Sequence, residues 1–373
     1  MTTQEVDVIT AEEPTRRAGL SPAGVVGRGT AFAILAALVL LLPSVSDSFT
    51  YNATQGAVFA LVGLSMNLLV GYTGQLSLGQ QGFYGLGALV AANITASGIN
   101  PSEPLSFGFG LGATVLVGAI AATVLGLVAL RVTGLYLALL TLVFGAAVTS
   151  SVFGIPSLNG NDAGVKAVRP HFLAGGMRYY LFVVAIVAVV FYVDRRLIAS
   201  KPGRAMLATK ENERAAEAFG INVVATKLLA FAMSGAIAGL AGGLDVFLPQ
   251  TFSQKNYVGA IGFNLALTFV VVAVVGGLGN RVGVVVASVF FGLLDYILSS
   301  IFKAFGATGY YIDHKNYLPG LIGSLLLLDT VVRRPGGLGQ ILSPLTRWMS
   351  GKPFSLHGDD DASGSEVAAD VRA

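Results

Sequence analysis

The sequence predicts an all-α fold, a polytopic bundle of transmembrane helices. Hydrophobic residues make up 54% of the chain and charged residues only 12%, with a mean hydropathy of +0.73. Charge is also unevenly spread, because residues 29–130 and residues 228–280 carry only two charged side chains each. The charges gather instead in residues 194–227, a polar segment between long apolar stretches. This pattern is typical of a membrane protein with one large polar loop.

Crossing the hydrocarbon core takes roughly 20 mostly apolar helical residues, and the chain offers about ten such stretches, with a range of 8–10. In order, these predicted spans are residues 30–45, 54–70, 76–96, 107–130, 132–153, 179–198, 228–248, 260–278, 282–302 and 317–332. Glycines and polar residues crowd residues 71–82. The second and third spans are therefore predicted to be broken or partly re-entrant helices.

Three regions follow from these spans. Residues 1–29 are a cytoplasmic N-terminal tail of mixed charge, unlike a cleaved signal peptide. Residues 30–335 form the membrane domain. Residues 336–373 are a cytoplasmic tail that is expected to be largely disordered after a short interfacial helix at 338–349.

Basic residues in the short loops set the orientation. If the N-terminus lies inside, most of the basic loops lie in the cytoplasm. These loops carry Arg28, Arg131, residues 194–227, Arg281, Arg333 and Arg334. Residues 154–178 are the exception, since they carry Lys166, Arg169 and Arg178 on the outside. We interpret them as an ordered external cap over a pore mouth, and a misplaced span is the competing explanation.

Residues 194–227 form the predicted docking loop. Residues 205–219 contain strong helix formers with Glu213, Arg214 and Glu217 at helical spacing, and Gly220 supplies a helix stop. A short cytoplasmic helix with apolar and charged side chains suits insertion into a groove on a soluble partner. Alternatively, it is a solvated loop held near lipid headgroups by its positive charge.

A second candidate region lies at membrane depth. Amides and hydroxyls in the apolar bundle favour either the translocation path or helix packing. The candidate path residues are Asn67, Gln75, Ser77, Gln80, Gln81 and Asp295. Asp295 stands in an apolar run, where it is a functional or helix-pairing residue, or is merely interfacial if its helix starts later. In contrast, Gly235, Gly239 and Gly243 at four-residue spacing predict a packing face.

The sequence lacks the residues that several kinds of function would require. The chain has no cysteine, and its three histidines are scattered, so no metal site is proposed. No phosphate-binding G-x-x-x-x-G-K-[ST] motif is present, so energy from ATP would have to come from elsewhere. An ion-coupled carrier would need paired charges at depth, for which only Asp295 and Asp245 are candidates. A membrane-embedded enzyme lacks a catalytic constellation.

Four stretches resemble the LivM-like permease subunits of ABC importers for branched-chain amino acids. They are NLLVGYTGQLSLGQQGFYGLGAL at 67–89, RVTGLYLALLTLVFG at 131–145, SKPGRAMLATKENERAAEAFGINVVATKLLAFAMSGAIAGL at 200–240 and VVAVVGGLGNRVG at 271–283. The resemblance implies a pore-forming subunit in a bacterial inner membrane. It would pair with a second permease, two ATP-hydrolysing subunits that carry ATP and Mg, and an external binding protein, while this chain binds no cofactor.

In that family the cytoplasmic loop is received by the ATPase. The resemblance therefore implies a coupling role for Arg204, Glu213, Arg214, Ala215, Ala216 and Gly220. It also implies leucine, isoleucine and valine as substrates. Urea or short amides are close alternatives, and sugars or nucleosides more distant ones. From another class, the rival is an ion-coupled secondary carrier that works alone.

Overall fold

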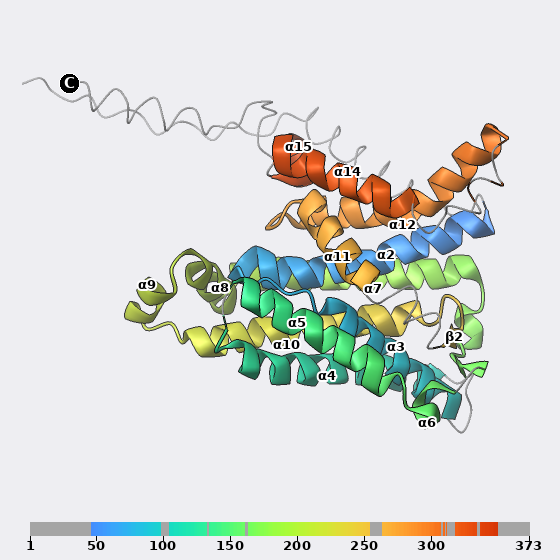
Figure 1. The fold of residues 1–373 in the computed structure, drawn as a ribbon, viewed down its shortest axis with the longest axis horizontal. Coiled ribbons are helices and arrows are strands. Elements are labelled where there is room, and N and C mark those ends of the chain that lie inside the picture. The colour runs from blue at the N-terminus through green and yellow to red at the C-terminus, as the bar shows by residue number, and fades with distance from the viewer. Residues whose placement is uncertain are drawn as a thin grey trace, which may run out of the picture. The chain divides into compact units, whose positions relative to one another are not determined.

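The computed structural model describes residues 46–97, 104–132, 134–160, 163–253, 263–306, 309, 311, 318–333 and 336–349. The chain is mostly helical (Figure 1). The first half contains α2 (Asp47–Met66), the π-helix η2 (Asn67–Gly71), α3 (Gln80–Ser97), α4 (Pro104–Ala129), α5 (Leu135–Ala147), the π-helix η3 (Val148–Val152), α6 (Pro156–Asn159), β1 (Val165–Lys166) and the 3-10 helix η5 (His171–Leu173). The second half contains α7 (Gly176–Ala199), α8 (Lys201–Glu211), α9 (Glu213–Ala218), α10 (Val223–Asp245), β2 (Thr251–Phe252), α11 (Phe263–Gly276), α12 (Arg281–Ala304), α14 (Leu318–Arg333) and α15 (Gly337–Met349).

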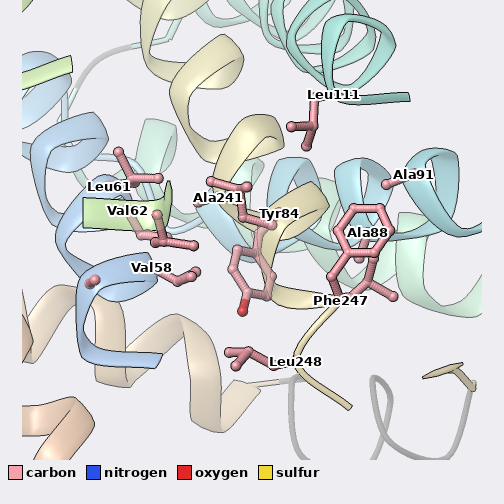
Figure 2. Close-up of a cluster of buried hydrophobic side chains, with 14 of the residues drawn as sticks. Val58, Leu61, Val62, Tyr84, Ala88, Ala91, Leu111, Ala241, Phe247 and Leu248 are labelled. Carbon is pink, nitrogen blue, oxygen red and sulfur yellow. The ribbon is translucent and has the colours of Figure 1, made fainter. Parts of the chain in front are cut away.

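The centre of the bundle is α2, which packs against α7, α10, α11 and α12. From Gly56 onward, α2 is buried at every position except the half-buried Phe59, as expected of a helix enclosed by others. Figure 2 shows Val58, Leu61 and Val62 of α2 in the same cluster as Tyr84 of α3 and Ala241 of α10. This core holds together the helices that carry the polar residues described below.

Helices α4 and α10 meet along a seam of small residues. A Cβ on Gly235 would collide with Ala122 and the Gly118 carbonyl of α4, and one on Gly243 would collide with Thr114. The predicted packing face of α10 is therefore confirmed. Small residues let the two backbones approach closely, which is the usual basis of helix association in a bilayer.

The predicted break between the second and third spans is also confirmed. After α2, the helix widens into η2, and residues 74–79 then run without helical structure, with Gly74 at φ 68°. Leu78 N donates to Thr141 Oγ1 of α5 at 2.8 Å, so a neighbouring side chain satisfies part of the opened backbone. Helix α3 accordingly starts at Gln80 rather than at residue 76.

Five of the described helices are long and apolar enough to cross a membrane: Asp47–Gly71, Ser106–Ala129, Leu135–Val152, Val223–Asp245 and Arg281–Ala304. Leu265–Gly276 is a shorter apolar helix. The protein is thus a polytopic helical membrane protein, and the count of ten spans stays a prediction. The predicted span at 30–45, the tail at 1–29 and residues 350–373 lie outside the described residues.

Within residues 154–178, the described segments 154–160 and 163–178 include α6, β1 and η5. Strand β1 pairs antiparallel with β2, with Val165 opposite Phe252. Arg169 Nε donates to the Phe247 carbonyl at 2.6 Å, and its guanidinium lies 4.4 Å from the ring centre of Tyr179. Burial lowers the pKa of the Arg169 guanidinium. A basic residue in a predicted external loop is thus explained by its structural partners.

Candidate coupling segment and polar clusters

The docking loop predicted from the sequence folds as two short helices rather than one. Residues 205–219 were expected to be continuous, but α8 ends at Glu211 and α9 starts at Glu213. Between them Asn212 has an extended backbone (φ −159°, ψ 109°), and its side chain accepts a hydrogen bond from Ala215 N at 3.1 Å. Asparagine is a favoured N-cap because its side chain competes for backbone donors. The single-helix prediction was wrong because it overlooked this cap.

Gly220 ends α9, as predicted. Its φ of 79° lies in the left-handed region that glycine adopts without a steric penalty. Gly220 N donates to the Glu217 carbonyl at 2.9 Å, and Ile221 N donates to the Ala216 carbonyl at 3.0 Å. This pair of bonds is a Schellman motif. Asn222 then caps α10 by accepting from Ala225 N, so α8 and α9, together the coupling segment, are bounded by defined turns.

The outer surface of the coupling segment is formed by part of the predicted set. Arg204, Arg214, Ala215 and Gly220 are exposed, whereas Ala216 is buried. Phe219, an apolar residue of the predicted docking helix, is 87% exposed. We call Arg214 and Phe219 the exposed tip of the coupling segment. Figure 1 shows α8 and α9 beyond the start of α10, at the opposite end of that helix from β2. Aromatic and arginine side chains are enriched at protein-binding surfaces, and Phe219 and Arg214 are both exposed here.

Glu213 has an internal partner. Its carboxylate lies 2.7 Å from Lys227 Nζ, and the Lys227 side chain is only 7% exposed. The pair links the start of α9 to the first turns of α10. We therefore expect loss of Glu213 to alter the shape of the coupling segment, in addition to any effect on a partner.

At the end of α7, a buried charged cluster joins three parts of the chain. Asp194 Oδ2 lies 2.8 Å from Arg281 Nε at the start of α12, and the Asp194 side chain is 1% exposed. Tyr72, just after η2, donates its hydroxyl to Asp194 Oδ2 at 2.9 Å. The same hydroxyl accepts from Arg281 Nε at 3.0 Å and from Asn67 Nδ2 at 2.9 Å. We call Asn67, Tyr72, Asp194 and Arg281 the charged node.

Two further hydrogen bonds to the backbone are made at or next to the charged node. Gly279 N donates to Asn67 Oδ1 at 2.7 Å, which ties the turn between α11 and α12 to the π-helix η2. Beside it, Lys210 Nζ of α8 donates to the Gly71 carbonyl at 2.9 Å. The last residue of η2 is thus bonded directly to the coupling segment, and the first residue of η2 is bonded to the α11–α12 turn.

A neutral cluster lies deeper in the bundle. Gln80, at the start of α3, donates from Nε2 to Ser234 Oγ of α10 at 2.9 Å. Ser65 Oγ of α2 lies 3.1 Å from Gln80 Oε1 and 3.0 Å from Ser234 Oγ. All three side chains are at most 1% exposed. We call Ser65, Gln80 and Ser234 the neutral cluster, and it joins three helices by hydrogen bonds.

The other candidate path residues lie in different surroundings. Gln75 and Ser77 are buried in the unwound segment, and Ser77 Oγ accepts from Gly79 N at 3.3 Å. Gln81 is buried against Gly145 of α5. Asp295 is exposed on α12 and accepts from the Tyr311 hydroxyl at 2.6 Å. Helix α12 starts at Arg281, so Asp295 lies well inside it rather than near its start.

Sequence reasoning missed several of these residues. Asp194 was treated as the first residue of a loop, although it lies in α7, and Arg281 served only as an orientation marker. Tyr72 and Ser234 were not singled out at all. A carboxylate at the end of an apolar run, and a serine within the apolar run FAMSGAIAGL, were the available signals. Their partners were not visible, because more than a hundred residues separate them in the chain.

Among the described residues, no group of three or more His, Cys, Asp or Glu side chains could hold a metal ion. These residues combine an exposed segment, an ion pair between that segment and α10, and buried hydrogen bonds between helices.

The chain matches a family of known proteins. The family model described as branched-chain amino acid transport system / permease component matches residues 48–328. The chain is 29% identical, over 80% of its length and 72% of the relative, to the high-affinity branched-chain amino acid transport system permease protein LivM of Salmonella typhimurium. The LivM protein of Escherichia coli is 28% identical over the same shares. No solved structure matches.

More distant relatives broaden the group. A probable branched-chain amino acid transport permease protein LivH of Methanocaldococcus jannaschii is 26% identical over 82% of this chain and 90% of its own. The galactose/methyl galactoside import permease protein MglC of Escherichia coli is 28% identical over 66% of this chain and 77% of its own. Because the family model covers most of the chain, the protein belongs to the branched-chain amino acid transport family of ABC-type permeases, as a transport component rather than an enzyme.

Proposed function

We propose that this protein is the translocating subunit of an ABC importer that carries leucine, isoleucine and valine across a bacterial inner membrane. It acts with a second permease, two ATPase subunits that hold ATP and Mg, and an external binding protein. The observation that carries this proposal is the match of residues 48–328 to the branched-chain amino acid permease model. The names of the LivM relatives support the choice of substrate.

The coupling segment supports the proposal that transport depends on a partner ATPase. Its two helices are bounded at Asn212 and Gly220, and they present Arg214 and Phe219 to solvent. The sequence has no phosphate-binding loop of its own. A rigid exposed segment on a chain without ATPase motifs suits a partner that supplies the energy.

A permease for urea or short amides is the alternative within the same class. The similarity to MglC adds a sugar as a third possible cargo. Substrate choice is tested by reconstituting the purified complex in proteoliposomes and measuring ATP-driven uptake of labelled leucine with each competitor in excess. We expect isoleucine and valine to compete, and urea, acetamide and galactose to leave uptake unchanged. Inhibition by urea or galactose alone would reassign the substrate.

The rival from another class is an ion-coupled carrier, and one observation favours it. Asp194 and Arg281 form a buried ion pair, and ionisable residues in a membrane bundle often mark ion pathways. A carrier would take up substrate alone, driven by a proton or sodium gradient. We expect the isolated chain to be inactive under either gradient. Gradient-driven uptake without ATP would overturn the proposal.

Docking is tested on the exposed tip. Replacing Arg214 and Phe219 together by alanine removes two exposed side chains suited to partner contact, and within the described part of the chain neither makes a hydrogen bond or ion pair whose loss would unfold it. We expect the variant to insert normally but to lose the ATPase on co-purification. The matched control is Arg333→Ala, an exposed arginine outside the coupling segment, which should retain the ATPase. Retention by both variants would contradict docking at this tip.

A further inference from the structure

The coupling segment is joined to the membrane bundle by the buried side chain of Met206 in α8 as well as by polar contacts. Helix α8 follows α7 after a turn at Ser200, where a Cβ on Gly203 would collide with the Leu197 carbonyl. Glycine at this position therefore permits close packing of α8 against the end of α7. A displacement of α8 must move the last turns of α7, which carry Asp194.

Asp194 contacts two other parts of the chain. Its carboxylate is bonded at once to Arg281 of α12 and to the hydroxyl of Tyr72. Tyr72 uses its full hydrogen-bonding capacity, one bond donated and two accepted, so it fixes Asp194, Arg281 and Asn67 in a single arrangement. Charged hydrogen bonds in a buried setting are strong and geometrically specific.

The element held by these contacts is not a regular α-helix. Residues 67–71 form a π-helix, and residues 74–79 are unwound, so the end of α2 is not a continuous α-helix. Such π-helical turns are uncommon and often occur at functional sites. Lys210 of α8 holds Gly71 at one end of the π-helix, and Gly279 of the α11–α12 turn holds Asn67 at the other.

We propose that the charged node is the transmission element of the transporter, in which Tyr72, Asp194 and Arg281 are positioning residues that convert movement of the coupling segment into rearrangement of η2 and α12. The node links three regions distant in sequence, namely the end of α2, the end of α7 and the start of α12. This inference rests on the proposed ATP-driven function. It assigns a role to residues that contact neither the exposed tip nor the neutral cluster.

Tyr72→Phe is the sharpest test, because it removes one hydroxyl and keeps the ring that packs in the core. Asp194 and Arg281 remain to balance each other's charge, so the chain should still fold and assemble. We expect uptake per ATP hydrolysed to fall about tenfold, the change that corresponds to losing a hydrogen bond to a charged group. ATP hydrolysis itself should continue. A residue with a merely structural role would instead lower assembly, and would lower uptake and hydrolysis in parallel.

Asp329→Asn is the matched control, since it breaks an ion pair with Arg333 in which both side chains are substantially exposed. Its uptake per ATP should equal that of the original protein. Unchanged uptake per ATP in Tyr72→Phe, with normal assembly, would overturn the inference while leaving the proposed function intact. If the original complex itself shows no ATP-driven uptake, the proposed function fails first.

Should Tyr72→Phe fail to assemble, Arg281→Lys gives a second measurement, because it keeps the charge but loses the planar donor group that meets both Tyr72 and Asp194. We expect reduced uptake per ATP in this variant too. Full coupling in assembled Arg281→Lys would contradict the proposed role of the arginine geometry.

Discussion

The charged node and the neutral cluster are both buried polar groups, yet they differ in what they connect. The neutral cluster joins α2, α3 and α10 through uncharged side chains that satisfy one another within the bundle. The charged node joins the ends of α2, α7 and α12 with a full ion pair, and it lies next to the Lys210 contact of the coupling segment.

The difference suggests a division of roles. Neutral hydrogen bonds at depth are inexpensive to bury and act as helix-packing contacts. A buried ion pair carries a large desolvation cost, so it is weak evidence for stability and needs another reason to be present. Transmission from the coupling segment is that reason in our account.

Arg281→Ala should have the largest effect. It leaves Asp194 buried without its cationic partner, which typically costs about 3–5 kcal/mol. We expect poor accumulation and a much lower melting temperature of the detergent-purified protein. Arg333→Ala, at an arginine whose side chain is 77% exposed, should change neither. Equal stability of the two variants would show that the Asp194–Arg281 pair does not form.

Ser234→Ala should have an intermediate effect. It removes the acceptor of Gln80 Nε2 and leaves a buried amide unsatisfied, at a cost of about 1–3 kcal/mol. We expect a lower melting temperature with unchanged uptake per ATP among the assembled complexes. Ser324→Ala is the control, because that hydroxyl is exposed and bonds only to its own helix. A selective loss of uptake in Ser234→Ala would place the neutral cluster on the translocation path instead.

Glu213→Gln should have the smallest effect on stability. Its partner Lys227 is buried but Glu213 is half-exposed, so solvent screens the pair and the loss should be about 1 kcal/mol or less. ATPase binding should weaken modestly, because α9 loses its link to α10. The measurement is co-purification of the ATPase, with Glu217→Gln, an exposed acid of the same helix, as the control. An identical loss of ATPase binding in both variants would mean that binding depends on the negative charge of α9 and not on the Glu213–Lys227 ion pair.

The sequence was sufficient to predict features that depend on local composition. The membrane class, the break near residues 71–82, the packing face of Gly235, Gly239 and Gly243, and the helix stop at Gly220 all follow from glycine content and apolar patterning. The split at Asn212 was also local, but the strong helix formers around it concealed the cap.

The charged node could not be predicted in the same way. Asp194 and Arg281 look like loop charges because each lies at the end of an apolar run, and only the packing of α7 against α2 and of α2 against α12 brings them together. Similarly, Gln80 was a candidate for either the path or packing. Its choice of partners depends on Ser65 and Ser234, which lie on other helices.

The most direct measurement compares Tyr72→Phe and Ser234→Ala in the same reconstituted complex, with uptake per ATP determined at equal amounts of assembled transporter. Our account predicts about a tenfold loss for Tyr72→Phe and no loss for Ser234→Ala. Equal values for the two variants, whether both normal or both reduced, would contradict the distinction between a transmitting charged node and a packing neutral cluster.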